Sequence, residues 1–128
     1  MMFVDTNYFL RYLLKDIPEQ HEEAKRLFVA AADGKVELMT TSLVFFEVYW
    51  VLRTFYGFHK KDILEALQKV LKFSFIQMSE RDILVKALGL FEKLNLDLED
   101  CYNLFYAKTA GVKEFKTFDK KLEKEFNK

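Results

Sequence analysis

The sequence predicts an α/β fold in which helices cover a central parallel sheet on both faces. Two observations lead to this prediction: short apolar runs alternate with longer amphipathic stretches, and no Pro- or Gly-rich linker interrupts them. Such alternation is typical of parallel sheets, because parallel strands need a crossover connection between them. With 128 residues, about half of them hydrophobic, we expect one domain over residues 1–128.

The first half of the chain predicts two strands, each followed by helices. Short uncharged apolar runs indicate the strands, and apolar residues three and four apart indicate the helices. Pro18 starts one helix, because proline is favoured at the first helical position, and glycines 34 and 57 end helices. The expected strands are Met1–Val4, buried on both faces, and Val36–Thr40. Four helices are expected: one after Asp5, one from Pro18, one from Thr41 or Ser42, and one over His59–Leu71.

The second half predicts two further strands and three helices. Ser79, with Asp82 three residues later, is close to a capping box and opens a helix. Gly111 ends the next helix, and Asp119 begins a Lys-rich final one. The expected strands are Phe73–Met78 and Glu114–Thr117. The expected helices are one that opens at Ser79 and runs through Ile83, Ala87, Leu90 and Leu94, one over Asp97–Ala110, and one from Asp119.

The charges exclude a strongly basic protein. Twenty basic and twenty acidic side chains balance, so the chain lacks the global positive charge of many nucleic-acid binders. The balance is uneven, since residues 1–50 carry five basic and eight acidic side chains, and residues 108–128 carry seven Lys and four acids. This distribution is compatible with metal ligands beside phosphate contacts, and equally with ordinary solvated faces.

Cysteine usage and hydropathy indicate a cytoplasmic protein. Cys101 is the single cysteine, so no internal disulfide can form. Asp5 interrupts the N-terminus before an apolar signal region develops, and no uncharged apolar run reaches the ~18 residues of a membrane span. We therefore expect a cytoplasmic location and no membrane partner.

Glu47 is the residue that local structure explains least. It is the only charge between Glu37 and Arg53, and its helical neighbours three and four residues away are all apolar. We expect it on a buried stripe, where an ionised carboxylate costs several kcal/mol unless something compensates its charge. The compensating partner would be a cation elsewhere in the chain, a proton or a metal ion.

Three more carboxylates are candidates, and two of them lie where parallel sheets place their sites. Asp5 and Asp119 follow predicted strands, whose carboxyl ends form one edge of the sheet, and Asp100 lies in the first turn of a helix. Simpler roles are open: Asp5 and Asp119 as helix N-caps, and Asp100 as a charge that complements a helix dipole. Oxygen ligands without His or Cys favour Mg²⁺ or Mn²⁺, and His21 and His59 lack the spacing of a zinc site.

Four short motifs resemble those of PIN domains, and they follow the family order along the whole chain. They are Val4-Asp5-Thr6-Asn7, residues 42–48 around Glu47, residues 96–103 around Asp100, and residues 116–122 around Asp119. The small size is similar to VapC-type toxins of toxin–antitoxin pairs. This resemblance implies a three-layer α/β/α sandwich and a metal-dependent ribonuclease.

The resemblance also implies a role for each acid. Asp5 and Asp100, with Asp119, would hold one or two Mg²⁺ or Mn²⁺ ions, and Glu47 would orient a water molecule or serve as an outer ligand. The implied catalytic and metal-binding set is Asp5, Glu47, Asp100 and Asp119, supported by hydrogen bonds from Thr6, Asn7 and Thr117. Whether Asp97 and Glu99 join the site stays open, and Cys101 and Tyr102 stand where the family often has a small residue.

An RNA substrate and an antitoxin protein are the partners that the resemblance implies. The apolar helix from Ser42 predicts, in addition, a homodimer or an antitoxin complex. Either would bury some of Phe45, Phe46, Tyr49, Trp50, Phe55 and Tyr56. Two alternatives remain: a PIN-like binding or scaffold subunit without nuclease activity, and an aspartate-based phosphohydrolase, in which a second Asp would stand in place of Asn7.

Overall fold

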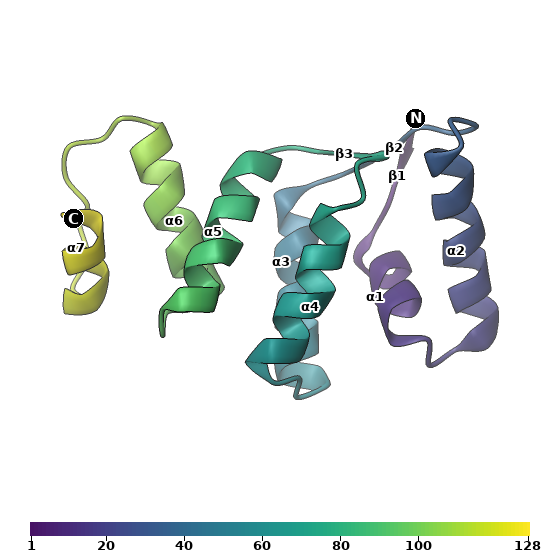
Figure 1. The fold of residues 1–128 in the computed structure, drawn as a ribbon, viewed down its shortest axis with the longest axis horizontal. Coiled ribbons are helices and arrows are strands. Elements are labelled where there is room, and N and C mark those ends of the chain that lie inside the picture. Colours follow the sequence, from purple (N-terminus) through teal and green to yellow (C-terminus); the bar gives the residue numbers. More distant parts are fainter. The chain divides into compact units, whose positions relative to one another are not determined.

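Three parallel strands pair in the order β1–β2–β3 in the computed structural model, which describes residues 1–128 (Figure 1). The strands are β1 (Met2–Phe3), β2 (Leu38–Thr40) and β3 (Ile76–Met78). Met2 lies opposite Leu38, and Leu38 lies opposite Ile76. The chain divides into two compact units, residues 1–81 and residues 82–128, and each is described by itself.

Helical crossovers connect the strands in the first unit. α1 (Thr6–Leu14) and α2 (Pro18–Ala32) lie between β1 and β2 in the chain, and α3 (Ser42–Trp50), a π-helical turn η1 (Val51–Phe55) and α4 (Lys60–Leu71) lie between β2 and β3. α1 packs against α2 and α3. The chain is therefore an α/β protein with a parallel sheet flanked by helices, as the alternation of strands and helices predicts.

The predicted helix boundaries of the first unit are confirmed within a few residues. Pro18 occupies the first turn of α2, and Gly34 follows that helix with a left-handed backbone, φ 76°. Thr41 caps α3 by accepting a hydrogen bond from the backbone N–H of Val44 at 3.3 Å. Gly57 also has a positive φ, 64°, and separates η1 from α4.

The first strand was predicted to be buried on both faces, and this is wrong. Met2 is 43 % exposed and Phe3 is 54 % exposed, so neighbouring side chains of β1, which lies at one edge of the three-stranded sheet, both reach solvent. Only Val4, just after the strand, is buried. An apolar run therefore marks the strand correctly and does not reveal that the strand lies at an edge.

The second unit contains three helices: α5, which begins at the end of the first unit (Arg81–Lys93), α6 (Leu98–Thr109) and α7 (Lys120–Phe126). α5 begins two residues after Ser79, since Glu80 has a left-handed φ of 61°. Of the four residues through which this helix was predicted to run, Ala87 is buried, and Ile83, Leu90 and Leu94 are half-buried. The buried face is Leu84, Ala87, Leu88 and Phe91.

The fourth predicted strand, Glu114–Thr117, is not a strand. This segment is extended without strand pairing, and Glu114 and Lys116 form a surface ion pair at 3.1 Å. Phe115 packs on Phe126 of α7 with the ring centroids 5.3 Å apart. Phe115 thus contacts α7 through its side chain, where the sequence had predicted a strand. No helix in the structure combines the length and apolar character needed to cross a bilayer.

Candidate functional site

The carboxyl edge of the sheet carries Asp5. This residue follows β1 with an extended backbone and caps α1, since its Oδ1 accepts a hydrogen bond from the N–H of Thr6 at 2.8 Å. The N-cap role is therefore real. It engages one carboxylate oxygen and leaves Oδ2 of this exposed side chain for another ligand.

A threonine at the end of β2 fixes the chain just before Asp5. The hydroxyl of Thr40, which is 2 % exposed, donates a hydrogen bond to the backbone oxygen of Val4 at 2.9 Å. The N–H of Val4 in turn donates to the backbone oxygen of Met39 at 2.8 Å. Sequence reasoning missed Thr40; the signal available was a polar side chain at the end of an otherwise apolar strand.

The two predicted supporting residues after Asp5 lie in different environments. Thr6 is buried, and its hydroxyl oxygen has no hydrogen-bond partner. Asn7 is exposed on the first turn of α1. A buried hydroxyl without a partner is unusual in proteins, and beside Asp5 it is available to bond a ligand or a water molecule.

Glu47 lies on α3 and is half-buried, so the prediction of a buried stripe is wrong in part. Its helical neighbours Val44 and Val51 are buried and half-buried, but Leu43 is 61 % exposed and Trp50 is 38 % exposed. The carboxylate therefore lies at the margin of the apolar face, where water reduces the cost of its charge. No cation from the first unit pairs with it.

Glu80 is a further acid at the carboxyl edge that sequence reasoning missed. It follows β3 by two residues, and its Oε1 accepts a hydrogen bond from the hydroxyl of Ser42 at 2.9 Å. This bond connects the residue after β3 to the first turn of α3, the helix that carries Glu47. The rule that sites gather at the carboxyl ends of parallel strands could have singled Glu80 out.

Asp100 lies in an acidic environment in the second unit. It is half-buried in the first turn of α6, and burial raises its pKa, with further increases from the negative charges of Asp97, Glu99 and Asp119. Asp100 and Asp119 are thus close enough to repel each other. The Oε1 atom of Glu99 is also buried, and this atom accepts no hydrogen bond. Cations stabilise such a group of carboxylates.

Asp119 is the N-cap of α7. Its Oδ1 accepts hydrogen bonds from the N–H groups of Lys121 and Leu122, at 3.0 and 3.2 Å. The hydroxyl of Thr117 accepts a bond from the N–H of Asp119 at 3.1 Å, so Thr117 contacts the backbone of this acid. As with Asp5, the cap engages one oxygen, and Oδ2 makes no hydrogen bond.

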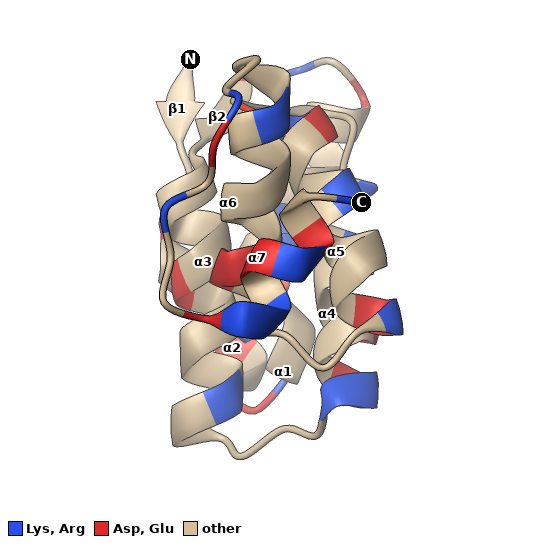
Figure 2. Ribbon diagram, turned by 90° about the vertical axis from the view of Figure 1, so that its left-hand side faces the viewer, with Lys and Arg blue, Asp and Glu red and all other residues tan.

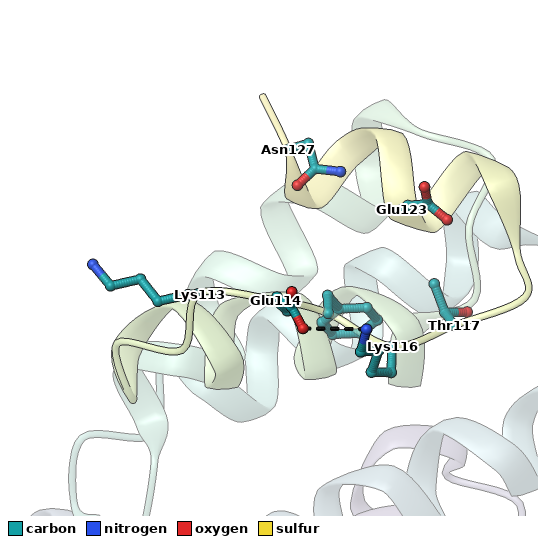
Figure 3. A pocket seen from close by; sticks show the side chains of 7 residues that line it. Lys113, Glu114, Lys116, Thr117, Glu123 and Asn127 are labelled. Carbon is teal, nitrogen blue, oxygen red and sulfur yellow. Dashed lines mark ion pairs between the residues drawn. The ribbon is translucent and has the colours of Figure 1, made fainter.

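Thr117 also lines a polar depression of about 320 Å³ in the second unit (Figure 3). Its other lining residues are Lys113, Glu114, Phe115, Lys116, Glu123 and Asn127. Lys116 is paired with Glu114, whereas Lys113 extends away from that pair. Figure 2 shows basic and acidic residues side by side along α7, so the predicted Lys-rich helix carries both signs of charge.

The four predicted acids are divided equally between the two units. Asp5 and Glu47 belong to the first, and Asp100 and Asp119 belong to the second, where they lie near each other. Neither unit by itself holds three or more Asp, Glu, His or Cys side chains grouped as a metal site. The donor chemistry nevertheless fits Mg²⁺ or Mn²⁺, because every candidate is a carboxylate and the negative charge of Asp119 acts on half-buried Asp100.

Comparison with known proteins identifies relatives over nearly the whole chain. A curated VapC ribonuclease from Aquifex aeolicus is 23 % identical over 124 residues, which cover 97 % of this chain and 91 % of that protein. A second similar protein is VapC20 from Mycobacterium tuberculosis, whose crystal structure is described as that of a toxin that cleaves the sarcin–ricin loop. The match covers 98 % of this chain and 95 % of the VapC20 chain. That match has 19 % identity and a TM-score of 0.45.

The family model described as PIN domain matches residues 2–125. This match includes both units and all four predicted acids, and it agrees with the parallel sheet flanked by helices. The chain belongs to the PIN domain family.

Proposed function

We propose that the protein is an endoribonuclease that depends on Mg²⁺ or Mn²⁺, and that it is the toxin of a toxin–antitoxin pair. The observation that carries this proposal is the match to the PIN family over residues 2–125, together with four carboxylates at the positions of the family motifs. The similarity to a VapC ribonuclease supports the same reaction. A cytoplasmic location, where RNA is available, is part of the proposal.

Asp5, Glu47, Asp100 and Asp119 are the carboxylates that would hold the divalent ion or ions. Such an ion, when bound, polarises the phosphodiester and makes water a better nucleophile. Oδ1 of Asp5 and of Asp119 caps a helix, which fixes both carboxylates and directs their second oxygens outward. The backbone N–H of Thr6 donates a hydrogen bond to Asp5, and the hydroxyl of Thr117 accepts one from the N–H of Asp119.

The lysines near Asp119 would bind the RNA backbone. Lys113 and Lys116 line the depression beside Thr117, and Lys120 and Lys121 begin α7 next to the acid. Phosphate contacts of this kind position a strand without reading its sequence. Binding should therefore weaken as the salt concentration rises, since counterions compete for the same charges.

Cleavage of an unstructured RNA, with and without divalent ions, tests this proposal. We expect cleavage in Mg²⁺ or Mn²⁺ and none in EDTA, because the acids alone offer no electrophile to the phosphate. Glu47→Gln and Asp100→Asn should each abolish cleavage. Asp62→Asn, which changes an exposed acid of α4, is the matched control and should cleave like wild type.

Two results would reject the proposal. Unchanged cleavage in EDTA would indicate a contaminating metal-independent ribonuclease. No cleavage of several RNAs in any divalent ion would favour the alternative in which a PIN-like subunit binds partners without nuclease activity. Balanced net charge and exposed aromatic side chains such as Phe118 and Phe55 are the features that support this alternative.

A further inference from the structure

A second polar depression, of about 270 Å³, opens between α1 and α2 in the first unit. Asn7, Tyr8 and Arg11 line it from α1, and Gln20 and Glu23 line it from α2. Asn7 follows Asp5 by two residues, so the depression begins within one helical turn of a proposed metal ligand. Its volume is below that of a typical site for drug-sized ligands, about 300–1,000 Å³, which suits a ligand as small as one nucleobase.

Hydrogen bonds hold two of the lining side chains in place. The hydroxyl of Tyr8 donates to Oε2 of Glu23, and this bond is the main reason that the pKa of Tyr8 is raised. Arg11 donates from Nη1 to both carboxylate oxygens of Asp16 at 2.9 and 2.8 Å, and from Nη2 to the hydroxyl of Tyr56 at 3.0 Å. The wall is therefore built before any ligand binds, which lowers the entropic cost of binding.

The charges of the wall do not suit a phosphate. Asp16 compensates the positive charge of Arg11, while Glu23 retains a carboxylate at the rim whose Oε1 has no hydrogen-bond partner. A phosphate would be repelled by this carboxylate. The side-chain amides of Asn7 and Gln20 offer both donors and acceptors, so the wall suits a neutral polar ring that presents N–H groups to Glu23.

We propose that this depression is a base-recognition subsite that binds guanine in single-stranded RNA, with Glu23 as the residue that determines specificity. The inference rests on the proposed ribonuclease function. Guanine presents two adjacent donors on its Watson–Crick edge, N1–H and the N2 amine, which match the two oxygens of one carboxylate. Adenine, cytosine and uracil lack this pair. Tyr8 is a positioning residue that orients Glu23, and its ring adds an aromatic surface of the kind on which bases stack.

NMR titration of the whole protein in EDTA with the oligonucleotides UUGUU and UUIUU tests the subsite. Inosine (I) retains N1–H and lacks the N2 amine. We expect the guanine oligonucleotide to shift the side-chain NH₂ resonances of Asn7 and Gln20 and to bind about tenfold tighter than the inosine one, the scale of one good base-edge pairing. Glu23→Gln should remove most of this difference, and Tyr8→Phe should remove part of it. Glu22→Gln changes an exposed acid of the same helix that does not line the depression, and it should retain the full difference.

Equal binding of guanine and inosine by wild type would overturn the subsite, as would undiminished discrimination by Glu23→Gln. Resonance shifts that leave Asn7 and Gln20 unaffected would also overturn it. Because the titration contains no divalent ion, its result is independent of cleavage. If the protein discriminates guanine from inosine but never cleaves RNA in Mn²⁺, the subsite stands and the ribonuclease proposal is wrong. If it cleaves RNA without discriminating, the ribonuclease proposal stands and the subsite is wrong.

Discussion

At the scale of single residues, the carboxylates differ in how far local structure explains them. Asp5 and Asp119 cap helices, which is a common structural role for Asp, and that role is compatible with metal binding through the second oxygen. Asp100 is different, because it caps nothing and lies half-buried among other acids that raise its pKa. It is therefore the residue at which a binding role and a structural role predict opposite effects on stability.

Asp100→Asn should leave the metal-free melting temperature equal to or higher than that of wild type. The amide keeps the shape and removes a charge that neighbouring acids repel. A carboxyl whose pKa is raised in the folded state destabilises the fold when ionised, and this penalty disappears as the pH falls through that pKa. The advantage of the variant should thus be largest near neutral pH and shrink toward about pH 4, where ordinary carboxyl groups titrate.

Thermal unfolding at both pH values, without metal, measures this effect. The matched control is Asp82→Asn, an exposed acid in the first turn of α5. This control should lose about 0.3–1 kcal/mol of stability, because it removes a favourable charge at the start of a helix dipole. Its melting temperature should not rise at neutral pH. If Asp100→Asn behaves like this control, Asp100 merely complements its helix.

Two substitutions of Asp119 separate its capping role from its metal-binding role. Asn is as good an N-cap as Asp, so Asp119→Asn should keep α7 and its stability while losing cleavage. Asp119→Ala should lose cleavage and, in addition, about 0.5–2 kcal/mol of stability. Denaturant unfolding and a cleavage assay on both variants check this expectation, and full activity in Asp119→Asn would reduce the residue to a cap.

At the scale of elements, the sequence predicts the boundaries of strands and helices better than their surroundings. Pro18, Gly34 and Thr41 determine where helices begin and end by local backbone chemistry, and those boundaries are confirmed. The sequence does not identify the buried face of α5, because two overlapping apolar stripes share Ala87 and periodicity alone cannot choose between them. Tertiary packing makes that choice.

The sequence likewise identifies candidate acids and cannot predict what surrounds them. The four candidate carboxylates were identified from the motifs. Thr40 and Glu80 were missed, because their importance arises from contacts with Val4 and Ser42, each more than thirty residues away in the chain. The sequence also did not predict how far each acid is buried, since Glu47 was expected on a buried stripe and is half-buried. Such long-range contacts have no local signal.

Thr40→Val should destabilise the junction between β1 and Asp5. The substitution keeps the shape and leaves the backbone oxygen of Val4 without its hydroxyl donor, which costs about 1–3 kcal/mol for a buried group. RNA cleavage should fall as well, since Asp5 directly follows Val4 in the chain. Denaturant unfolding and the RNA assay measure both effects. Thr54→Val, whose hydroxyl bond is exposed, is the matched control and should change neither.

At the scale of the whole molecule, the predicted interface on the helix from Ser42 needs revision. Phe45, Phe46 and Tyr49 are buried within the chain, so they cannot bury further surface against a partner. Leu43 is 61 % exposed and Phe55 is 78 % exposed. These two residues, with Trp50, are therefore the side chains of this region that a homodimer would cover.

Leu43→Arg should convert a wild-type dimer into a monomer without lowering the melting temperature, because the residue lies on the surface of the chain. Light scattering on purified protein measures the change. Val85→Arg, which alters an apolar side chain of α5 that is 50 % exposed, should remain dimeric. Wild-type protein that is monomeric at high micromolar concentration, with no copurifying partner, would contradict the expected interface.

The central claim is that the carboxylates of the family motifs bind a divalent ion, and Asp100 and Asp119 are two of them that lie near each other. Its most direct test is the Mn²⁺-dependent rise in melting temperature of wild type, Asp100→Asn, Asp119→Asn and the double variant. A ligand at ~100 times its dissociation constant stabilises a protein by about 2.7 kcal/mol. We predict that either single substitution removes most of this gain and that the double variant loses no more, since residues that act on one ligand are not additive. Single variants that respond to Mn²⁺ like wild type, or losses that simply add, would contradict the claim.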